Sequence, residues 1–271
     1  MKPRRYRLRR AASSQWHVSH HDIRAISDVL VSPLLVVLPV CNEEANIRDE
    51  IERWMSCLRH LTIPFQILAL DDGSRDGTSR ILLEMETEQA ASLCVVSKPN
   101  TGHGTTCRIG YDIAVNSAAE WVLQIDSDGQ CDPQHFFEFW NRRESFDCVF
   151  GVRTTRDDGL ARAVTSAICR LAASALCAHD LRDANVPYRL MRRETLEVAL
   201  RCIPPTFQIH NVALTYVLKK LRGVRWSYVP IHFPARRAGP NRLNMLKIVA
   251  WGVDMLLELI RIRVPPAERA W

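Results

Sequence analysis

A short apolar run that stops on two carboxylates constrains the fold of this chain more than any other feature. The run Val122–Ile125 has the length of a buried strand, and Asp126 and Asp128 follow it. Carboxylates at the end of a strand offer hard oxygen ligands, which Mg²⁺ and Mn²⁺ prefer. The alternative is a solvated turn, because Asp and Gly are common turn residues. By itself, the pattern leaves both interpretations open.

Upstream of this run, strand patterns alternate with helical patterns. Apolar strands are predicted at 34–38, 66–70 and 93–96. Helices are predicted between them, the first capped by Asn42, and a further helix should follow the glycine-bearing turn 100–104. This alternation predicts an α/β fold with right-handed crossovers and a mostly parallel sheet between two helical layers.

A second acidic pair, Asp71 and Asp72, follows the predicted strand 66–70. Ligands bind at the carboxyl ends of strands in open parallel sheets, so we expect both acidic pairs at one crevice. The turn Gly102-x-Gly104 lacks the third glycine of a dinucleotide fingerprint and the Gly-Lys-Ser/Thr of a P-loop. We therefore exclude both of those nucleotide folds.

The second half of the chain is predicted to continue the same architecture. The predicted elements are a strand at 147–150, a loop from Gly151, a helix at 160–177, a strand at 186–192, helices at 193–201 and 208–221, and a strand at 224–229. A polar stripe recurs at every fourth residue of the helix 160–177, namely Arg162, Ser166, Arg170 and Ser174. Two arginines and two hydroxyls can grip a phosphate. A solvated helix face is the alternative.

Composition indicates a globular protein of a reducing compartment. The chain has 271 residues, of which 47% are hydrophobic, and its nine cysteines are scattered without Cys-x-x-Cys spacing. No signal-peptide pattern and no apolar window of about 18 residues occurs, so we expect a cytoplasmic chain without a transmembrane helix. The net charge of +6 is concentrated at the two ends and favours an anionic surface as partner. The basic N-terminus lacks stacking aromatics, so we expect no nucleic-acid partner.

Four motifs, in this order and spacing, resemble the family-2 glycosyltransferases. They are Pro39–Glu44, Asp71–Thr78, Asn100-x-Gly102-x-Gly104 and Asp126-x-Asp128-x-Gln130. The resemblance covers about residues 34–243 and implies a GT-A fold, a nucleotide-sugar donor and a site for Mg²⁺ or Mn²⁺. Further features make the chain most similar to the branch that transfers hexoses to dolichyl or polyprenyl phosphate: Gln130, Gly151-x-Arg153, Asp183 with Arg189, and Arg237-x-Gly239.

The resemblance also implies roles for single residues. It implies metal ligation by Asp126, Asp128 and Gln130, with Arg153 as a further catalytic residue. It implies that the donor is bound by Pro39, Cys41, Glu43, Leu70, Asp72, Ser127, Gln130 and Arg237. Of these, Asp72 would accept a hydrogen bond from base or ribose. Arg170 and Ser174 resemble the pair that receives the acceptor phosphate, although Arg162 and Ser166 have the same spacing.

Residues 207–211 depart from the family, since hydroxyl-transferring members carry a Glu-Asp base there and the polyprenyl-phosphate branch carries Lys and Glu. A sugar hydroxyl must lose its proton as it attacks, whereas a phosphate monoester, with a second pKa of about 6, is already an anion. The missing base therefore predicts a polyprenyl phosphate acceptor, with His210 and Asp183 left as candidate bases. The sequence does not distinguish a GDP-linked from a UDP-linked donor. Two alternative functions also remain: a family-2 enzyme with a hydroxyl acceptor and an inactive nucleotide-sugar-binding subunit.

We expect three segments along the chain: a basic, flexible arm at 1–33, a catalytic domain at 34–242, and an amphipathic helix with its tail at 243–271. The helix 243–262 has an apolar face broad enough for a core or for the surface of a membrane. We expect it to hold the chain on the cytoplasmic face of a membrane. The alternatives are packing on the catalytic domain, on a membrane-anchoring protein or on a second copy of the chain.

Overall fold

The computed structural model describes residues 6–7, 19–60, 62, 64–156, 183–204, 210–233, 259, 262 and 264. Its strands are β1 (Tyr6–Arg7), β2 (Leu34–Val40), β3 (Phe65–Asp72), β4 (Leu93–Lys98), β5 (Trp121–Gln124), β6 (Cys148–Arg156), β7 (Arg189–Arg192) and β8 (Trp226–Phe233). Its helices are α1 (His20–Ser27), α2 (Ile47–Arg59), α3 (Thr78–Glu88), α4 (His103–Val115), α5 (Phe136–Arg142), α7 (Arg193–Cys202) and α8 (His210–Lys220), with a 3-10 turn, η1, at Pro133–His135.

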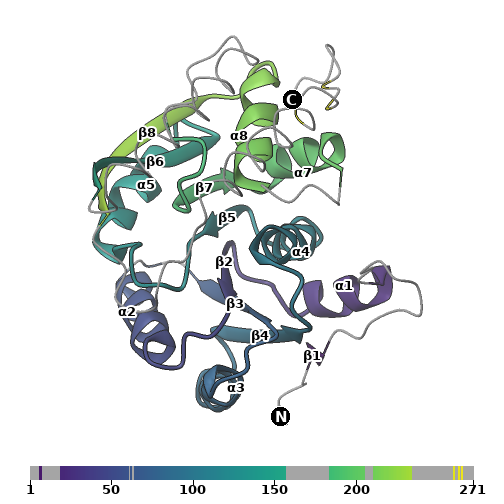
Figure 1. Ribbon diagram of the computed structural model, residues 1–271. Coiled ribbons are helices and arrows are strands. Elements are labelled where there is room, and N and C mark those ends of the chain that lie inside the picture. The colour runs from purple at the N-terminus through teal and green to yellow at the C-terminus, as the bar shows by residue number, and fades with distance from the viewer. Residues whose placement is uncertain are drawn as a thin grey trace, which may run out of the picture.

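The described strands form one sheet in the order β1-β4-β3-β2-β5-β7-β6-β8 (Figure 1). Strands β1, β4, β3, β2 and β5 run parallel to one another. Strand β7 is antiparallel to both of its neighbours, and β8 is parallel to β6. The carboxyl ends of β3, β2 and β5 therefore meet at one edge of the sheet, and the expected mostly parallel α/β architecture is confirmed.

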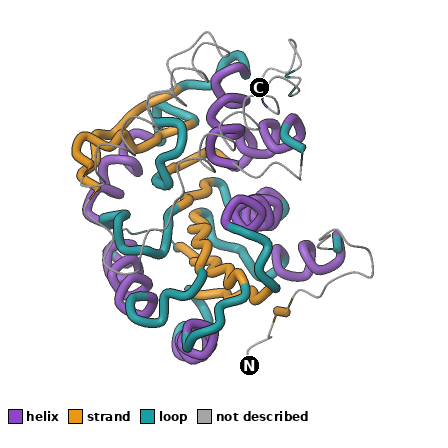
Figure 2. The backbone as a smooth tube through the Cα atoms, in the orientation of Figure 1, coloured by secondary structure: helices purple, strands orange, loops and turns teal. Residues whose placement is uncertain are grey.

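Helices cover both faces of this sheet (Figures 1 and 2). Helices α2, α3 and α5 lie on one face, and α1, α4, α7 and α8 lie on the other. Every residue of β2 and β3 is buried, which explains why both strands read as continuous apolar runs rather than as alternating patterns. On α2, the apolar positions with helical spacing are buried as expected: Ile47, Ile51, Trp54, Met55 and Leu58.

Two predicted boundaries are wrong. Helix α2 begins at Ile47 rather than at Asn42, because Asn42 adopts a left-handed φ of 55° and binds the loop after β3. Its backbone N–H donates to Ser74 Oγ at 3.0 Å, and its Oδ1 accepts from the backbone N–H of Arg75 at 2.8 Å. The expected loop at Gly151 is instead part of β6, whose pairing with β8 continues to Arg156.

Residues 19–33, which were expected to be part of a flexible arm, have defined structure. Helix α1 begins at His20, after Ser19 has accepted a capping hydrogen bond from the backbone of Asp22. Ile26 and Leu30 are buried in the core, and Ser27 Oγ donates to the carbonyl of Ile113 on α4 at 2.9 Å. Residues 19–33 therefore belong to the folded unit.

In the part of the chain that the structure describes, no helix has both the length and the apolar character needed to cross a membrane. The predicted amphipathic helix 243–262 lies outside the described residues, except for Leu259 and Ile262. Both of these side chains are buried with the hydrophobic core. At these two positions, protein rather than solvent or lipid covers the apolar side chain.

Candidate functional site

A pocket of about 390 Å³ opens at the carboxyl ends of β2, β3 and β5. Its walls come from the last residues of β2 and β3, from the loops that follow β2, β4 and β5, and from the first turn of α4. The lining residues are Pro39, Val40, Cys41, Glu43, Asp72, Asn100, Gly102, His103, Thr106, Asp126, Ser127 and Asp128. The structure thus brings Asp72, Asp126 and Asp128, from two strand ends, to one cavity, while Asp71 is not among the lining residues.

The acidic turn after β5 forms one wall of this pocket. Asp126 keeps 27% of its side chain exposed, and its Oδ1 accepts a hydrogen bond from Gln124 Nε2 at 3.2 Å. Asp128, also partly exposed, accepts at Oδ1 from the backbone N–H of Gln130 at 3.2 Å. Two solvent-accessible carboxylates, one residue apart, are the hard oxygen donors that Mg²⁺ or Mn²⁺ requires. The residues present therefore fit a divalent metal ion.

Gln130 does not line the pocket, and its role as a metal ligand stays a prediction. The backbone of Gln130 supports Asp128. His103, which the sequence reasoning did not select, lies beside the acidic turn, with Nε2 3.7 Å from Asp126 Oδ1 and 3.4 Å from Cys107 Sγ. The Cys107 sulfur and the Asp126 carboxylate raise the pKa of His103. The His103 side chain therefore lies beside the carboxylate that the pocket offers to a cation.

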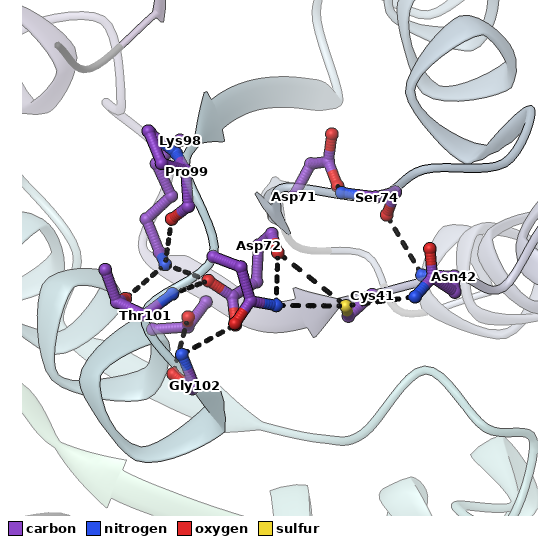
Figure 3. Close-up of polar contacts among 11 residues, drawn as sticks. Cys41, Asn42, Asp71, Asp72, Ser74, Lys98, Pro99, Thr101 and Gly102 are labelled. Carbon is purple, nitrogen blue, oxygen red and sulfur yellow. Dashed lines mark hydrogen bonds and ion pairs between the residues drawn. The ribbon is translucent and has the colours of Figure 1, made fainter.

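Asp72 forms the opposite wall and organises the loop after β4 (Figure 3). Its side chain is only 5% exposed and is paired with the ammonium group of Lys98, which is 0% exposed. The backbone N–H groups of Thr101 and Gly102 donate to Asp72 Oδ1 and Oδ2 at 2.8 and 3.0 Å. Lys98 Nζ also donates to Thr101 Oγ1 at 2.6 Å. Asp72 thus joins Lys98 to the loop after β4, an arrangement that we call the Asp72 clasp. This role is separate from any contact with base or ribose.

Cys41 lies where the loops after β2, β3 and β4 meet. Asn100 Nδ2 donates to Cys41 Sγ at 3.5 Å and to the carbonyl of Asp72 at 2.9 Å. Burial and the carboxylates of Asp72 and Asp71 raise the pKa of the Cys41 thiol. The pocket therefore presents a neutral thiol, which suits packing rather than nucleophilic attack.

Gly73 allows these loops to approach closely. Its φ is +66°, and a Cβ atom at this position would lie 2.6 Å from the backbone nitrogen of Asn100. The neighbouring Asp71 carboxylate is buried and accepts from the backbone N–H of Ser74 at 3.0 Å and from Ser79 Oγ. Asp71 therefore shapes the turn and does not reach the pocket lining.

Leu70 is placed differently from the role that the resemblance implied, and Arg153 has a partner within the protein. Leu70 is 0% exposed and packs against α4 at Gly110, so its side chain belongs to the core rather than to the pocket lining. Arg153 forms a bidentate ion pair with Asp183, with Nε–Oδ2 and Nη2–Oδ1 distances of 2.7 and 2.6 Å. Its guanidinium group is directed to this carboxylate.

The two candidate bases both lie in the protein interior. Asp183 is held by Arg153, and His210 is 2% exposed, with its ring 6.1 Å from the ring of Tyr111. Arg189 is fully buried and donates to the carbonyls of Ala184, Val186 and Asn211 rather than to Asp183. The remaining predicted site residues lie outside the described residues: Arg162, Ser166, Arg170, Ser174 and Arg237.

Sequence reasoning overlooked Lys98, Gln124 and His103. Each carried a signal, since Lys98 ends an apolar strand, Gln124 interrupts one, and His103 separates two glycines. A polar residue within a buried run needs a hydrogen-bond partner, but the sequence does not show which residue that partner is.

Comparison with known proteins places this site in a family. The model of "Glycosyl transferase family 2" matches residues 35–200, more than half of the chain. An undecaprenyl-phosphate 4-deoxy-4-formamido-L-arabinose transferase of Yersinia enterocolitica is 23% identical over 228 residues, which cover 83% of this chain and 67% of that protein. The protein of the same name from Pectobacterium atrosepticum is 26% identical over 223 residues, with coverages of 82% and 65%. The chain spans about two thirds of the length of these relatives.

Solved structures show the same fold. Glucosyl-3-phosphoglycerate synthase of Mycobacterium tuberculosis, in complex with Mn²⁺, UDP-glucose and phosphoglyceric acid, superposes with a TM-score of 0.61 at 18% identity and covers 96% of this chain and 89% of its own. The same enzyme in complex with Mg²⁺ and UDP gives a TM-score of 0.60, with coverages of 97% and 88%. The chain belongs to glycosyl transferase family 2 and has the GT-A fold.

Proposed function

We propose that the chain is a metal-dependent, inverting glycosyltransferase that moves a hexose from a nucleotide sugar to a polyprenyl phosphate. The pocket carries this proposal, because one cavity joins the acidic turn at Asp126 and Asp128 to the loops around Cys41 and Asp72. A nucleoside diphosphate requires both parts. Its base and ribose need a shaped pocket, and its charge needs a cation next to that pocket.

On the donor side, we assign Pro39, Cys41, Glu43 and Asp72 to the nucleoside and Ser127 to the diphosphate, since all five line the pocket. Asp126 and Asp128 hold the metal ion, with Gln130 supporting their turn. When bound there, Mg²⁺ or Mn²⁺ stabilises the negative charge that develops on the leaving nucleoside diphosphate. The mycobacterial synthase of similar fold has been crystallised with Mn²⁺ or Mg²⁺ and UDP, which supports this assignment.

On the acceptor side, Arg170 and Ser174 remain our assignment for the phosphate, and Arg153 and Arg237 for the donor phosphates. An oxygen of the acceptor phosphate attacks the anomeric carbon and forms the new C–O bond. The bond from this carbon to the diphosphate breaks at the same time, and the nucleoside diphosphate leaves with the electron pair. One in-line displacement of this kind inverts the anomeric centre and depends mainly on alignment.

A phosphate acceptor agrees with the state of the two candidate bases. Neither the buried ring of His210 nor the paired carboxylate of Asp183 is available to remove a proton from a sugar hydroxyl. A phosphate monoester arrives already ionised. The relatives named as undecaprenyl-phosphate transferases support the same acceptor class.

Because a polyprenyl acceptor is embedded in a bilayer, we also propose that the chain works as a peripheral protein on the cytoplasmic face of a membrane. Basic residues contribute about 1 kcal/mol each when they lie close to an anionic leaflet. Sedimentation with anionic and with neutral liposomes tests this part. Equal recovery in the supernatant with both would contradict it.

The acceptor assay tests the proposal directly. Transfer is measured with Mn²⁺, a short polyprenyl phosphate and, in parallel, the matching polyprenol. We expect product with the phosphate alone, whereas equal transfer to the alcohol would indicate a hydroxyl-transferring enzyme. A thermal-shift panel of GDP- and UDP-linked hexoses, with a UDP-linked aminoarabinose derivative included because the relatives carry an arabinose-derived sugar, identifies the donor.

A further inference from the structure

A buried glutamine lies directly behind the metal-binding carboxylate. Gln124 is the last residue of β5, and its side chain is 0% exposed between Val37 of β2 and Arg189 of β7. Burying an amide without hydrogen bonds is costly, so a glutamine is unfavourable here unless both ends of its side chain are bonded. Leu123 and Ile125, its neighbours in the sequence, are fully buried and apolar.

Both ends of the Gln124 side chain are bonded, and the direction of each bond is determined. The Asp126 carboxylate only accepts hydrogen bonds, so Gln124 must present Nε2 to Asp126 Oδ1, at 3.2 Å. This turns Gln124 Oε1 towards Tyr111, whose hydroxyl donates to it at 3.2 Å. The result is a directed chain from Tyr111 through Gln124 to Asp126.

Helix α4 can supply Tyr111 because it lies unusually close to the sheet. A Cβ atom at Gly110 would lie 2.5 Å from Val37 Cγ1, so a larger residue would push the helix away. Tyr111 is 0% exposed and is fixed in place by this packing. The tyrosine therefore gives Gln124 one orientation rather than several.

We propose that Gln124, oriented by Tyr111, is a positioning residue that aligns the Asp126 carboxylate for metal binding. Gln124 Nε2 donates to Oδ1 at 3.2 Å, and His103 Nε2 lies 3.7 Å from the same oxygen. The Gln124 contact would fix the orientation of the Asp126 carboxylate, which lines the pocket and would hold the cation. Outer hydrogen bonds of this kind orient ligands and raise metal affinity.

This inference rests on the proposed function and is tested by a measurement other than transfer. Binding of Mn²⁺ in the presence of UDP is followed by electron paramagnetic resonance and by calorimetry for the full chain. The variants are Gln124→Leu, which removes the donor to Asp126, and Tyr111→Phe, which removes a single hydroxyl. Val122→Ala is the matched control, because Val122 is a fully buried residue of the same strand without a polar side chain.

We expect Gln124→Leu to weaken Mn²⁺ affinity by about 10-fold or more and Tyr111→Phe to weaken it by a smaller factor. Val122→Ala should lower the unfolding temperature and leave the affinity unchanged. In transfer assays, Gln124→Leu should raise the Mn²⁺ concentration that gives half-maximal rate. The factor of this increase should exceed the factor by which the rate at saturating Mn²⁺ falls.

Wild-type affinity in both Gln124→Leu and Tyr111→Phe would overturn the inference and leave the proposed function intact. If Gln124→Leu does not fold, Tyr111→Phe decides alone, since an unchanged affinity in that variant has the same meaning. Absence of Mn²⁺ binding in the wild-type chain would instead overturn the proposed function, and this inference with it.

Discussion

Replacing His210 with phenylalanine should make the chain more resistant to acid, because the native imidazole is buried in its neutral form. His210 is 2% exposed at the start of α8. Burial lowers its pKa to about 3, and the positive charges of Arg108, Arg189 and His103 act in the same direction. Phenylalanine keeps a ring against Tyr111 and has no titratable group.

The expected size of the effect follows from proton linkage. In the unfolded chain the imidazole titrates near its ordinary pKa of about 6.5. Below this pH the unfolded state binds a proton that the folded state does not, so the free energy of unfolding falls as the pH falls. The loss is about 1.4 kcal/mol at about pH 5.5 and about 2.7 kcal/mol at about pH 4.5, and it is negligible above about pH 7.5.

Urea unfolding at about pH 7.5 and about pH 5.5 measures this contribution. The free-energy difference between His210→Phe and wild type should grow by about 1.3 kcal/mol in favour of the variant between these two pH values. Val212→Ala, a buried change on the same helix without a titratable group, should give the same difference at both. A constant difference for His210→Phe would refute the reasoning and would make His210 available as a base again.

Other perturbations test the clasp, the loop packing and the ion pair beside the pocket. Lys98→Met should lower the free energy of unfolding, measured with urea, by about 3–5 kcal/mol, because it leaves the Asp72 carboxylate buried without a counter-charge. A decrease below about 1 kcal/mol would show that the Asp72 clasp is unimportant for stability. Gly73→Ala should cost about 1–3 kcal/mol and weaken nucleotide binding, since it forces a strained φ and a 2.6 Å approach to Asn100; unchanged UDP affinity by calorimetry would contradict this. Arg153→Met and Asp183→Asn should be non-additive in a double-mutant cycle of unfolding free energy, because the two side chains share two hydrogen bonds; additive effects would mean that the pair is not formed in solution.

The layers of this fold were predictable because burial leaves a plain pattern. Strands β2 and β3 are covered on both faces, so their central residues appear in the sequence as apolar runs, and α2 shows one apolar stripe. The start of α2 was mispredicted because Asn42 is a good capping residue by composition, yet tertiary contacts with Ser74 and Arg75 hold it in a left-handed turn. Contacts of that kind join residues about 30 positions apart and leave no local signal.

The position of the site was also predictable, but the state of its residues was not. Carboxylates after parallel strands must meet at one sheet edge, which located Asp72, Asp126 and Asp128. Sequence spacing could not reveal that Lys98 neutralises Asp72 or that Asp183 binds Arg153, because each pair joins separate elements of the fold. It also could not show that His210 points into the core, since an amphipathic pattern does not identify which polar residue is covered.

The most direct test of the proposed function is transfer to a short polyprenyl phosphate by the wild-type chain and by Asp128→Ala, each with Mn²⁺ and with a chelator. Asp128 supplies one of the two carboxylates of the acidic turn and is partly exposed, so its loss should spare the fold. We predict that wild-type transfer requires Mn²⁺ and that Asp128→Ala falls to background while its urea unfolding stays close to that of wild type. Transfer by either protein that persists undiminished in chelator would contradict the metal-dependent mechanism.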